Sequence, residues 1–557
     1  MKKYLKDFIV FFIILIINSI VTIKLNKLPD WDFYSYHFHN GWAFWHNRLD
    51  IDFLPNLFRS YFNPLLDGLI YFGIERLNHY PLIFLLISGF KYGILMFISF
   101  KLYELLFDNL DKFNKYMGVV FSLLLASSSP IILFCLSFDN TDIQCANLVL
   151  IGLYLFLKGI FNDSSKSRYC LIFFAMVFEG MALGLKYVNI IYIVSFLLTT
   201  LCLIKLIQKP VKTILFLILG TFTGFMCTGG WWFFTIWHKF KNPFFPYFND
   251  IFKSPFANSE SILNMDYLHL KANTIWEFIF YPLRNTAEKA FIGFEQKYYD
   301  LKIALSFILI VSIVSMLLNK SIREKISSII NLKFLYFILI FTIITYYTNN
   351  FLFTNIRYLI PLFVLAPAIY YLFIVSTVKK EYYVYPLIII TGLYFITYKG
   401  YFGLGQYPYK KEREIIRPIS LNIEDDAVVI CANFSACAAA PFQNTNVRYI
   451  GFSLPKRVIR YGFWIDKDFY KNQYYANEYL QKKLIKTFAE NNNIYFLYSE
   501  SNMGPDLVDL KLYKTALLMY TKGTLSIDIC HKFHYTILNY DIIDQHYICK
   551  IKSKVSK

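Results

Sequence analysis

Two aspartates stand just after the first long apolar segment, where a lipid environment does not require charge. Asp30 and Asp32 open a run that continues to Asn40 and contains Tyr36, four residues beyond Asp32. Acidic residues at a membrane face are costly, and such positions indicate function. A carboxylate in this setting accepts a proton from a hydroxyl or an amine. We therefore predict that Asp32 is a general base, with Asp30 as its nearest acidic partner.

More ionisable residues come from distant parts of the sequence, and all are expected at the same membrane face. Lys and Arg neutralise a phosphate leaving group while a carboxylate accepts a proton, so their convergence predicts chemistry on a lipid-linked phosphate. The candidate catalytic acids are Asp139 and Asp142, and the candidate substrate-binding residues are His37, His39, Lys186, His238, Lys239 and Arg357.

Each of these residues also has a purely structural interpretation. Asp32 could cap a helix over 33–46, and Asp139 and Asp142 could cap the next apolar helix. Lys186 and Arg357 could be cations that extend to the membrane surface. The two histidines could be packing groups, which is the more frequent role of such residues.

The elements that must position these groups are membrane helices. The 557 residues are 56% hydrophobic and 20% aromatic, which exceeds the apolar share of an ordinary soluble domain, roughly 45–50%. We expect about eleven membrane helices, since apolar runs of about 20 residues are typical of spans. They lie near 6–23, 82–104, 116–137, 143–161, 169–185, 188–207, 213–236, 302–319, 334–350, 357–378 and 382–399.

The net charge of +18 first suggests a nucleic-acid partner, but its distribution argues against one. Lys and Arg gather at alternate helix ends, for example at 2–6, 112–115, 205–212 and 320–333. This positive-inside pattern predicts a multi-pass protein of the plasma (inner) membrane with a cytoplasmic N-terminus. The first segment lacks a small-residue cleavage site and is expected to remain as an anchor.

Three long segments are then expected outside the cytoplasm. Loop 24–81 contains helix-like pieces at 33–46 and 64–78, whose aromatic faces suit either lipid packing or the wall of a substrate groove. Loop 237–301 has a helix break at Asn242-Pro243-Phe244-Phe245-Pro246. The transmembrane domain is thus assigned to 1–400.

Residues 401–557 are expected to form a soluble, extracytoplasmic α/β domain. Strand-like runs at 427–430, 449–452 and 494–498 alternate with a helical piece near 473–490. Four cysteines in this part permit two disulfides, and Cys431–Cys437 with Cys530–Cys549 is one of three pairings. The spacing of Cys and His predicts no structural zinc site.

With these residues in view, the sequence resembles polytopic glycosyltransferases of the GT-C superfamily. The resemblance rests on Asp32 after the first helix with Tyr36 four residues later, on Asp139 or Asp142 in the turn before the fourth helix, on the Gly184-Leu185-Lys186-Tyr187 run, and on Arg357-Tyr358 at the start of a late helix. It covers the membrane half in topology but only short motifs in residues. The family often has paired adjacent acids, whereas Asp32 is followed by Phe33.

The resemblance implies transfer of a sugar from a polyprenyl-phosphate-linked donor to a glycan, lipid or protein acceptor of the bacterial cell envelope. It implies Tyr36 and Tyr358 as substrate-binding residues, and a divalent metal is possible but not required. Inverting and retaining outcomes both stay open. The alternatives are a transporter or flippase for lipid-linked glycans, which usually carries charge at mid-membrane, and an O-antigen-type glycan polymerase.

Overall fold

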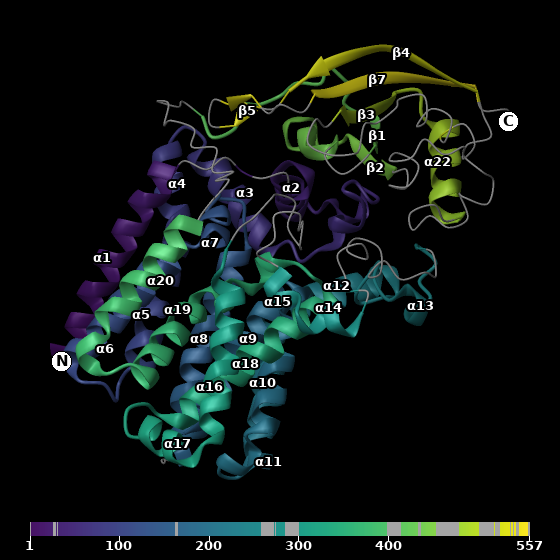
Figure 1. Cartoon of the computed structure of the whole chain (residues 1–557). Coiled ribbons are helices and arrows are strands. Elements are labelled where there is room, and N and C mark those ends of the chain that lie inside the picture. The colour runs from purple at the N-terminus through teal and green to yellow at the C-terminus, as the bar shows by residue number, and fades with distance from the viewer. Residues whose placement is uncertain are drawn as a thin grey trace.

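The computed structural model describes residues 2–25, 29, 32–161, 165–257, 272, 274–284, 300–397, 414–432, 436–452, 478–500, 517, 524–534, 536–537, 540–541 and 545–554. A bundle of long helices forms most of the molecule, and a small sheet covers one end of it (Figure 1). Helix α1 runs from the N-terminus toward the end that carries the sheet (Figure 1).

Seven helices in the described part of the chain are long and apolar enough to cross a membrane, which supports membrane character. An eighth crossing results if α16 and α17, which meet at a bend of 110°, count as one span. The single-helix spans are α1 (Lys2–Leu25), α8 (Asp142–Ile160), α9 (Ser165–Leu185) and α18 (Leu332–Leu352). The composite spans are α4–α5 (Pro81–Ser88, Phe90–Leu106), α11–η6–α12 (Pro210–Phe225, Met226–Gly230, Trp231–Phe240) and η9–α19 (Ile356–Leu359, Ile360–Thr377); the bent pair is α16 (Lys302–Leu318) with α17 (Lys320–Ser327).

The expected count of eleven spans is not confirmed, because three of the predicted segments form short helices. These are α6 (Lys112–Ser127), α10 (Ile190–Cys202) and α20 (Val384–Thr397), with 16, 13 and 14 residues. At a rise of 1.5 Å per residue they are about 20–24 Å long, less than the roughly 30 Å of a hydrocarbon core. The segment predicted at 116–137 breaks at Pro130, where α7 (Pro130–Phe134) begins, because proline cannot continue the preceding helix.

Glycines let the central helices approach closely. A Cβ on Gly224 of α11 would lie 1.9 Å from the backbone oxygen of Val177 on α9, and a Cβ on Gly180 of α9 would lie 2.1 Å from the oxygen of Thr221. Small residues at such contacts are typical of helix pairs in membranes. The contact fixes α9, whose last turn leads to Lys186.

The described part of segment 24–81, which we call the first external segment after its predicted location, forms short helices between the bundle and the sheet (Figure 1). The predicted pieces at 33–46 and 64–78 are confirmed as a π-helical turn η1 (Phe33–His37) with α2 (Phe38–Trp45), and as α3 (Leu65–Leu77). The side chains of 33–42 are buried, whereas Trp45 in the last turn of α2 is exposed. Single 3-10 turns η2 (Arg48–Asp50) and η3 (Leu57–Tyr61) connect them.

The second long external segment follows α12. The predicted break at Asn242–Pro246 is confirmed, since α12 ends at Phe240. Short helices α13 (Asn249–Phe252), α14 (Ile275–Ile279) and α15 (Tyr281–Arg284) follow. The polar stretch at 258–266 lies outside the described residues.

The C-terminal region contains a five-stranded sheet with the order β2-β1-β3-β7-β4. The strands predicted at 427–430, 449–452 and 494–498 are confirmed as β1 (Val428–Ala432), β2 (Arg448–Phe452) and β3 (Ile494–Glu500), which run parallel. The antiparallel strands β7 (Gln545–Lys554) and β4 (Thr524–Phe533) extend the sheet, β5 (Thr536–Ile537) pairs with β6 (Tyr540–Asp541), and α22 (Glu478–Glu490) corresponds to the predicted helix.

Both disulfides of this region follow the pairing considered from the sequence. Cys431 of β1 forms a disulfide with Cys437 of η11 (Ala436–Phe442), and Cys530 of β4 forms one with Cys549 of β7. The first disulfide therefore ties η11 to the sheet. Helix η11 in turn packs against η1 and α2.

The sheet is attached directly to the first external segment. Phe53 forms a parallel bridge with Ile450 of β2; its N–H donates to Tyr449 O at 2.9 Å, and its carbonyl accepts from Gly451 N at 2.8 Å. Beside this bridge, the buried side chain of Arg48 donates to both carboxylate oxygens of Asp52, at 2.7 and 2.8 Å. The same guanidinium donates to backbone carbonyls of the loop before β2, at Thr445 and Val447. The C-terminal sheet thus rests on the segment that carries Asp32.

Candidate functional site

Asp32 contacts Arg357, although the two residues are 325 positions apart in the chain. The guanidinium Nη1 donates to Asp32 Oδ2 at 3.1 Å, and both side chains are about 15% exposed. Asp32 stands at the start of η1, and its side chain makes no capping bond to that turn. Arg357 lies in η9, where Asn355 Oδ1 accepts from its backbone N–H at 3.0 Å. Asp32 therefore binds a cation rather than capping a helix.

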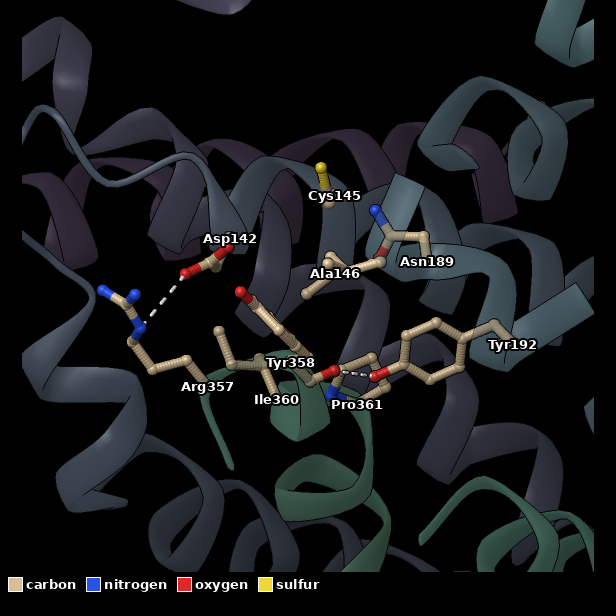
Figure 2. Close-up of a pocket in the computed structure, with 10 residues that line it drawn as sticks. Asp142, Cys145, Ala146, Asn189, Tyr192, Arg357, Tyr358, Ile360 and Pro361 are labelled. Carbon is tan, nitrogen blue, oxygen red and sulfur yellow. Dashed lines mark hydrogen bonds and ion pairs between the residues drawn. The ribbon is translucent and has the colours of Figure 1, made fainter. Parts of the chain in front are cut away.

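Asp142 and Lys186 continue the cluster. Lys186 Nζ lies 2.5 Å from Asp142 Oδ1. Arg357 Nε lies 4.0 Å from Asp142 Oδ2 (Figure 2). Asp142 begins α8, whose N-cap is Thr141, so the positive end of that helix favours its charge. Asp32, Arg357, Asp142 and Lys186 form one chain of alternating charges, which we call the ion-pair chain.

Two features of the sequence place Lys186 at this point. Gly184 packs on η6, where a Cβ would lie 2.4 Å from Thr228 Oγ1, so the tight contact requires glycine. Asn63 Nδ2 of the first external segment donates to Gly184 O at 2.8 Å and to Thr228 O at 2.9 Å. The Gly184-Leu185-Lys186-Tyr187 run thus connects α9, η6 and the external segment beside the ion-pair chain.

A second pair, His37 with Asp67, lies next to Asp32. His37 Nδ1 is 2.6 Å from Asp67 Oδ1, and both side chains are 5% exposed. The ring of Tyr36 lies 4.1 Å from that of His37, and Arg59 lies over the Tyr36 ring at 5.5 Å. Asp67 and Arg59 were not predicted as site residues. In the sequence, only their position within segment 24–81 pointed to them.

Charge strongly biases the protonation of this site. Burial alone would raise the pKa of Asp32, but Arg357, Arg59, His37 and Lys186 outweigh it and lower this pKa to about 2. Burial would lower the pKa of His37, but the charge and hydrogen bond of Asp67, with the charge of Asp32, raise it above its ordinary value. Asp32 is therefore held as a carboxylate, and His37 is biased toward its cation.

A small pocket opens beside the ion-pair chain (Figure 2). About 220 Å³ of space is free of protein atoms there, and part of it is open to solvent. Asp142 and Arg357 lie at its charged side, and the hydroxyl of Tyr192 donates to Tyr358 O within its wall. The full lining is Asp142, Cys145, Ala146, Val188, Asn189, Tyr192, Arg357, Tyr358, Ile360 and Pro361.

Other predicted site residues lie elsewhere. His39 is 2% exposed, hydrogen-bonds Asn56 through Nδ1 at 2.9 Å, and packs against Trp42 and Tyr449 under the sheet. Burial and the nearby Arg48 lower its pKa to about 3, so it is a neutral packing group.

The remaining predicted residues are divided between the edge of the site and its surroundings. His238 is exposed at the end of α12. Lys239 contacts Asp50 at 2.6 Å. Asp139 is fully buried in the turn before α8, and Asp30 lies outside the described residues. Tyr358 lines the pocket, and its predicted role in substrate binding stays a prediction.

Within the described ranges, no group of three or more His, Cys, Asp and Glu side chains is arranged to hold a metal ion. No known protein-family model matches the sequence, and no curated protein matches it either.

Proposed function

We propose that the chain is a membrane glycosyltransferase that moves a sugar from a polyprenyl-phosphate-linked donor to a glycan, lipid or protein acceptor. The observation that carries the proposal is the ion-pair chain, in which two carboxylates alternate with two cations. It lies beside a pocket and where membrane helices meet an external segment. We further propose that this end of the bundle faces away from the cytoplasm in a bacterial inner membrane, and that the fold is of the GT-C type.

Asp32 is proposed as the general base. An ionised carboxylate is the form that accepts a proton from the acceptor hydroxyl, while the sugar–phosphate bond breaks and the phosphate keeps the electron pair. Arg357 and Lys186 are proposed to bind that phosphate, because Arg and Lys form strong charge-assisted hydrogen bonds to phosphate oxygens.

The ion pair between Asp32 and Arg357 has a consequence for the order of events. Arg357 is the cation that lowers the pKa of Asp32 most, so Asp32 is a weak base before substrate binds. A donor phosphate beside Arg357 would compete for the guanidinium and add negative charge, and both effects raise the pKa of Asp32. Donor binding thus makes Asp32 a stronger base when the acceptor is needed.

The test uses the full chain in lipid nanodiscs with a panel of polyprenyl-phosphate hexoses and pentoses, and it measures release of polyprenyl phosphate. Asp32→Asn is expected to lower turnover by about 10²–10⁴-fold, the usual contribution of a general base, while donor binding is retained and the protein still unfolds in one cooperative thermal transition. Asp250→Asn, at an exposed position on α13, is the matched control and should match wild type. Full turnover by Asp32→Asn removes Asp32 as the base, and absence of turnover by wild type across the panel counts against the enzyme.

One buried residue favours a second candidate, a flippase for lipid-linked glycans. Glu179 lies within α9, is 1% exposed, and has no hydrogen-bond partner for either carboxylate oxygen among the described residues. It is seven residues before Lys186, or about 10 Å along the helix. A carboxyl group at this depth is the kind of residue that transporters use. Glycolipid translocation by wild type that is lost in Glu179→Gln, together with no sugar transfer by wild type, would favour the flippase.

A further inference from the structure

The π-helical turn η1 brings one ionisable pair next to Asp32 that the ion-pair chain does not include. His37 belongs to η1, and its partner Asp67 comes from α3, thirty residues later in the chain. Their contact of 2.6 Å is short, and each side chain is only 5% exposed. Burying two charged groups is costly unless their geometry is good, so this pair needs an explanation beyond surface electrostatics.

The groups around His37 favour its cation. Asp67 from α3 and Asp32 at the start of the same turn are carboxylates, and Lys186 after α9 is the opposing cation. The ring of Tyr36 packs against it. Helix η11 (Ala436–Phe442) also packs on η1. Its one ionisable residue, Cys437, is held in a disulfide and carries no charge. Asp67 and Asp32 thus raise the pKa of the imidazole and Lys186 lowers it. The guanidiniums of Arg59 and Arg357 lie beyond these neighbours, against Tyr36 and Asp32.

The hydrogen bond to Asp67 also determines which ring nitrogen remains for a ligand. A protonated imidazole has two N–H donors, and Asp67 accepts from Nδ1. The described part of the chain gives the ring no other hydrogen bond. The second donor, Nε2–H, is therefore available in a buried site beside the proposed base.

We propose that Asp67 is a positioning residue that keeps His37 protonated and oriented, so that its second N–H donates to the phosphate group that leaves the sugar. This rests on the proposed function. In the reaction, the bond between the sugar C1 and the phosphate oxygen breaks, the acceptor oxygen bonds to C1, and the acceptor proton goes to Asp32. The departing phosphate gains one negative charge, and a hydrogen bond from a fixed cation stabilises that charge as it develops. His37 keeps its proton throughout, so no further proton acceptor is needed.

The pH profile of turnover in nanodiscs tests the proposal. Wild type should lose activity at alkaline pH as His37 deprotonates. Asp67→Asn removes one of the two negative charges and the charged acceptor, so this alkaline limb should move to lower pH, and turnover at pH 8 should fall at least tenfold. Asp67→Glu keeps the charge and should move the limb back toward wild type. A merely structural pair would change the unfolding temperature but leave the position of the limb unchanged.

His37→Gln keeps a side chain that can hydrogen-bond Asp67 but cannot become a cation, so it should abolish the alkaline limb and lower turnover at neutral pH. If Asp67→Asn does not fold, the pH profile of His37→Gln tests the role of the His37 cation. Wild-type turnover with an unshifted limb in Asp67→Asn, or a retained limb in His37→Gln, overturns the proposal while the proposed function stands. If wild type transfers no sugar, the proposed function fails first; a ¹³C-histidine NMR titration that then finds His37 neutral at pH 7 overturns the assigned charge separately.

Discussion

Replacement of Gly451 by alanine is expected to separate the C-terminal sheet from the external segment beneath it. A Cβ at this position would lie 1.7 Å from the backbone oxygen of Leu54 and 2.6 Å from its carbonyl carbon. Both atoms belong to the backbone, so no side-chain rotation relieves the clash. The strand must move, and the bridge between Phe53 and β2 must open.

The size of the effect follows from the bonds at this bridge. Two backbone hydrogen bonds join Phe53 to Tyr449 and Gly451, and each is worth about 0.5–1.5 kcal/mol, or more when its groups are left buried and unpaired. Their loss costs roughly 2–4 kcal/mol. Alanine also has less backbone entropy than glycine in the unfolded chain, which stabilises the folded variant by about 0.4–1 kcal/mol. The net expected loss of stability is about 1–3 kcal/mol.

The assay is thermal unfolding of the purified protein followed by tryptophan fluorescence, which is informative because Trp42 lies against Tyr449. If the sheet and its supporting segment unfold as a unit of about 150–250 residues, the loss corresponds to a fall of roughly 2–12 °C in Tm. Gly392→Ala is the matched control, since nothing lies within 4 Å of a Cβ there. Equal Tm values for the Gly451→Ala and Gly392→Ala proteins would refute the docking geometry.

Three further predictions concern the site. Arg357 holds the pKa of Asp32 near 2, below its value in the unfolded chain, so the ion pair stabilises the fold above about pH 4. At pH 7, Arg357→Gln should therefore be less stable than wild type by about 2 kcal/mol. Urea titrations should show this difference disappear as the pH approaches 2, and a constant difference would contradict the prediction. Lys186→Gln should raise the KM for the donor about tenfold or more, since charged hydrogen bonds contribute about 1.5–3 kcal/mol; an unchanged KM would remove Lys186 from phosphate binding. Replacing Cys431–Cys437 by alanines should lower both kcat and Tm, because Cys437 belongs to η11, which packs on η1. The same change at Cys530–Cys549, which joins β4 to β7, should lower only Tm; equal kcat values would contradict this.

Hydrophobicity identified the membrane helices better than it identified their ends. Runs such as 143–161 and 334–350 are predominantly apolar over 19 and 17 residues, and they correspond to α8 and α18. The run at 188–207 is equally apolar, yet α10 ends at Cys202. Where a helix stops depends on local backbone geometry and on its neighbours, and hydropathy reports neither. The count of spans was therefore less predictable than the fold class.

The site was predictable in part for a physical reason. Asp32, Asp142, Lys186 and Arg357 were selected because charges at helix ends on one face of a membrane protein lie at a common depth, and the structure places all four in contact. The expected depth of a residue in the membrane does not show in which direction its side chain points from a loop. The external segment carries several charged residues, and the sequence did not show that Asp67 points toward His37.

His39 shows the same limitation in the opposite direction. It stands two residues after His37 and was expected to bind substrate, but successive turns of η1 and α2 direct it toward the sheet, where Asn56 and Tyr449 enclose it. Its environment depends on the docking of β2, which comes from a segment about 400 residues later. Contacts of such separation are set by the folded chain and are not visible in local spacing.

The attachment of the sheet to the external segment bears on what the C-terminal region does. Helix η11 packs on η1 and α2, and η1 carries His37 and follows Asp32 directly. A domain that only recruited an acceptor would not need to touch the turn that positions the proposed base. Because the Arg48–Asp52 pair and the Phe53 bridge are formed with residues of the loop and strand at 445–451, the position of η1 depends on the folded sheet. The C-terminal region is therefore part of the framework of the site, and loss of its docking should impair the reaction even where every residue of the ion-pair chain is intact.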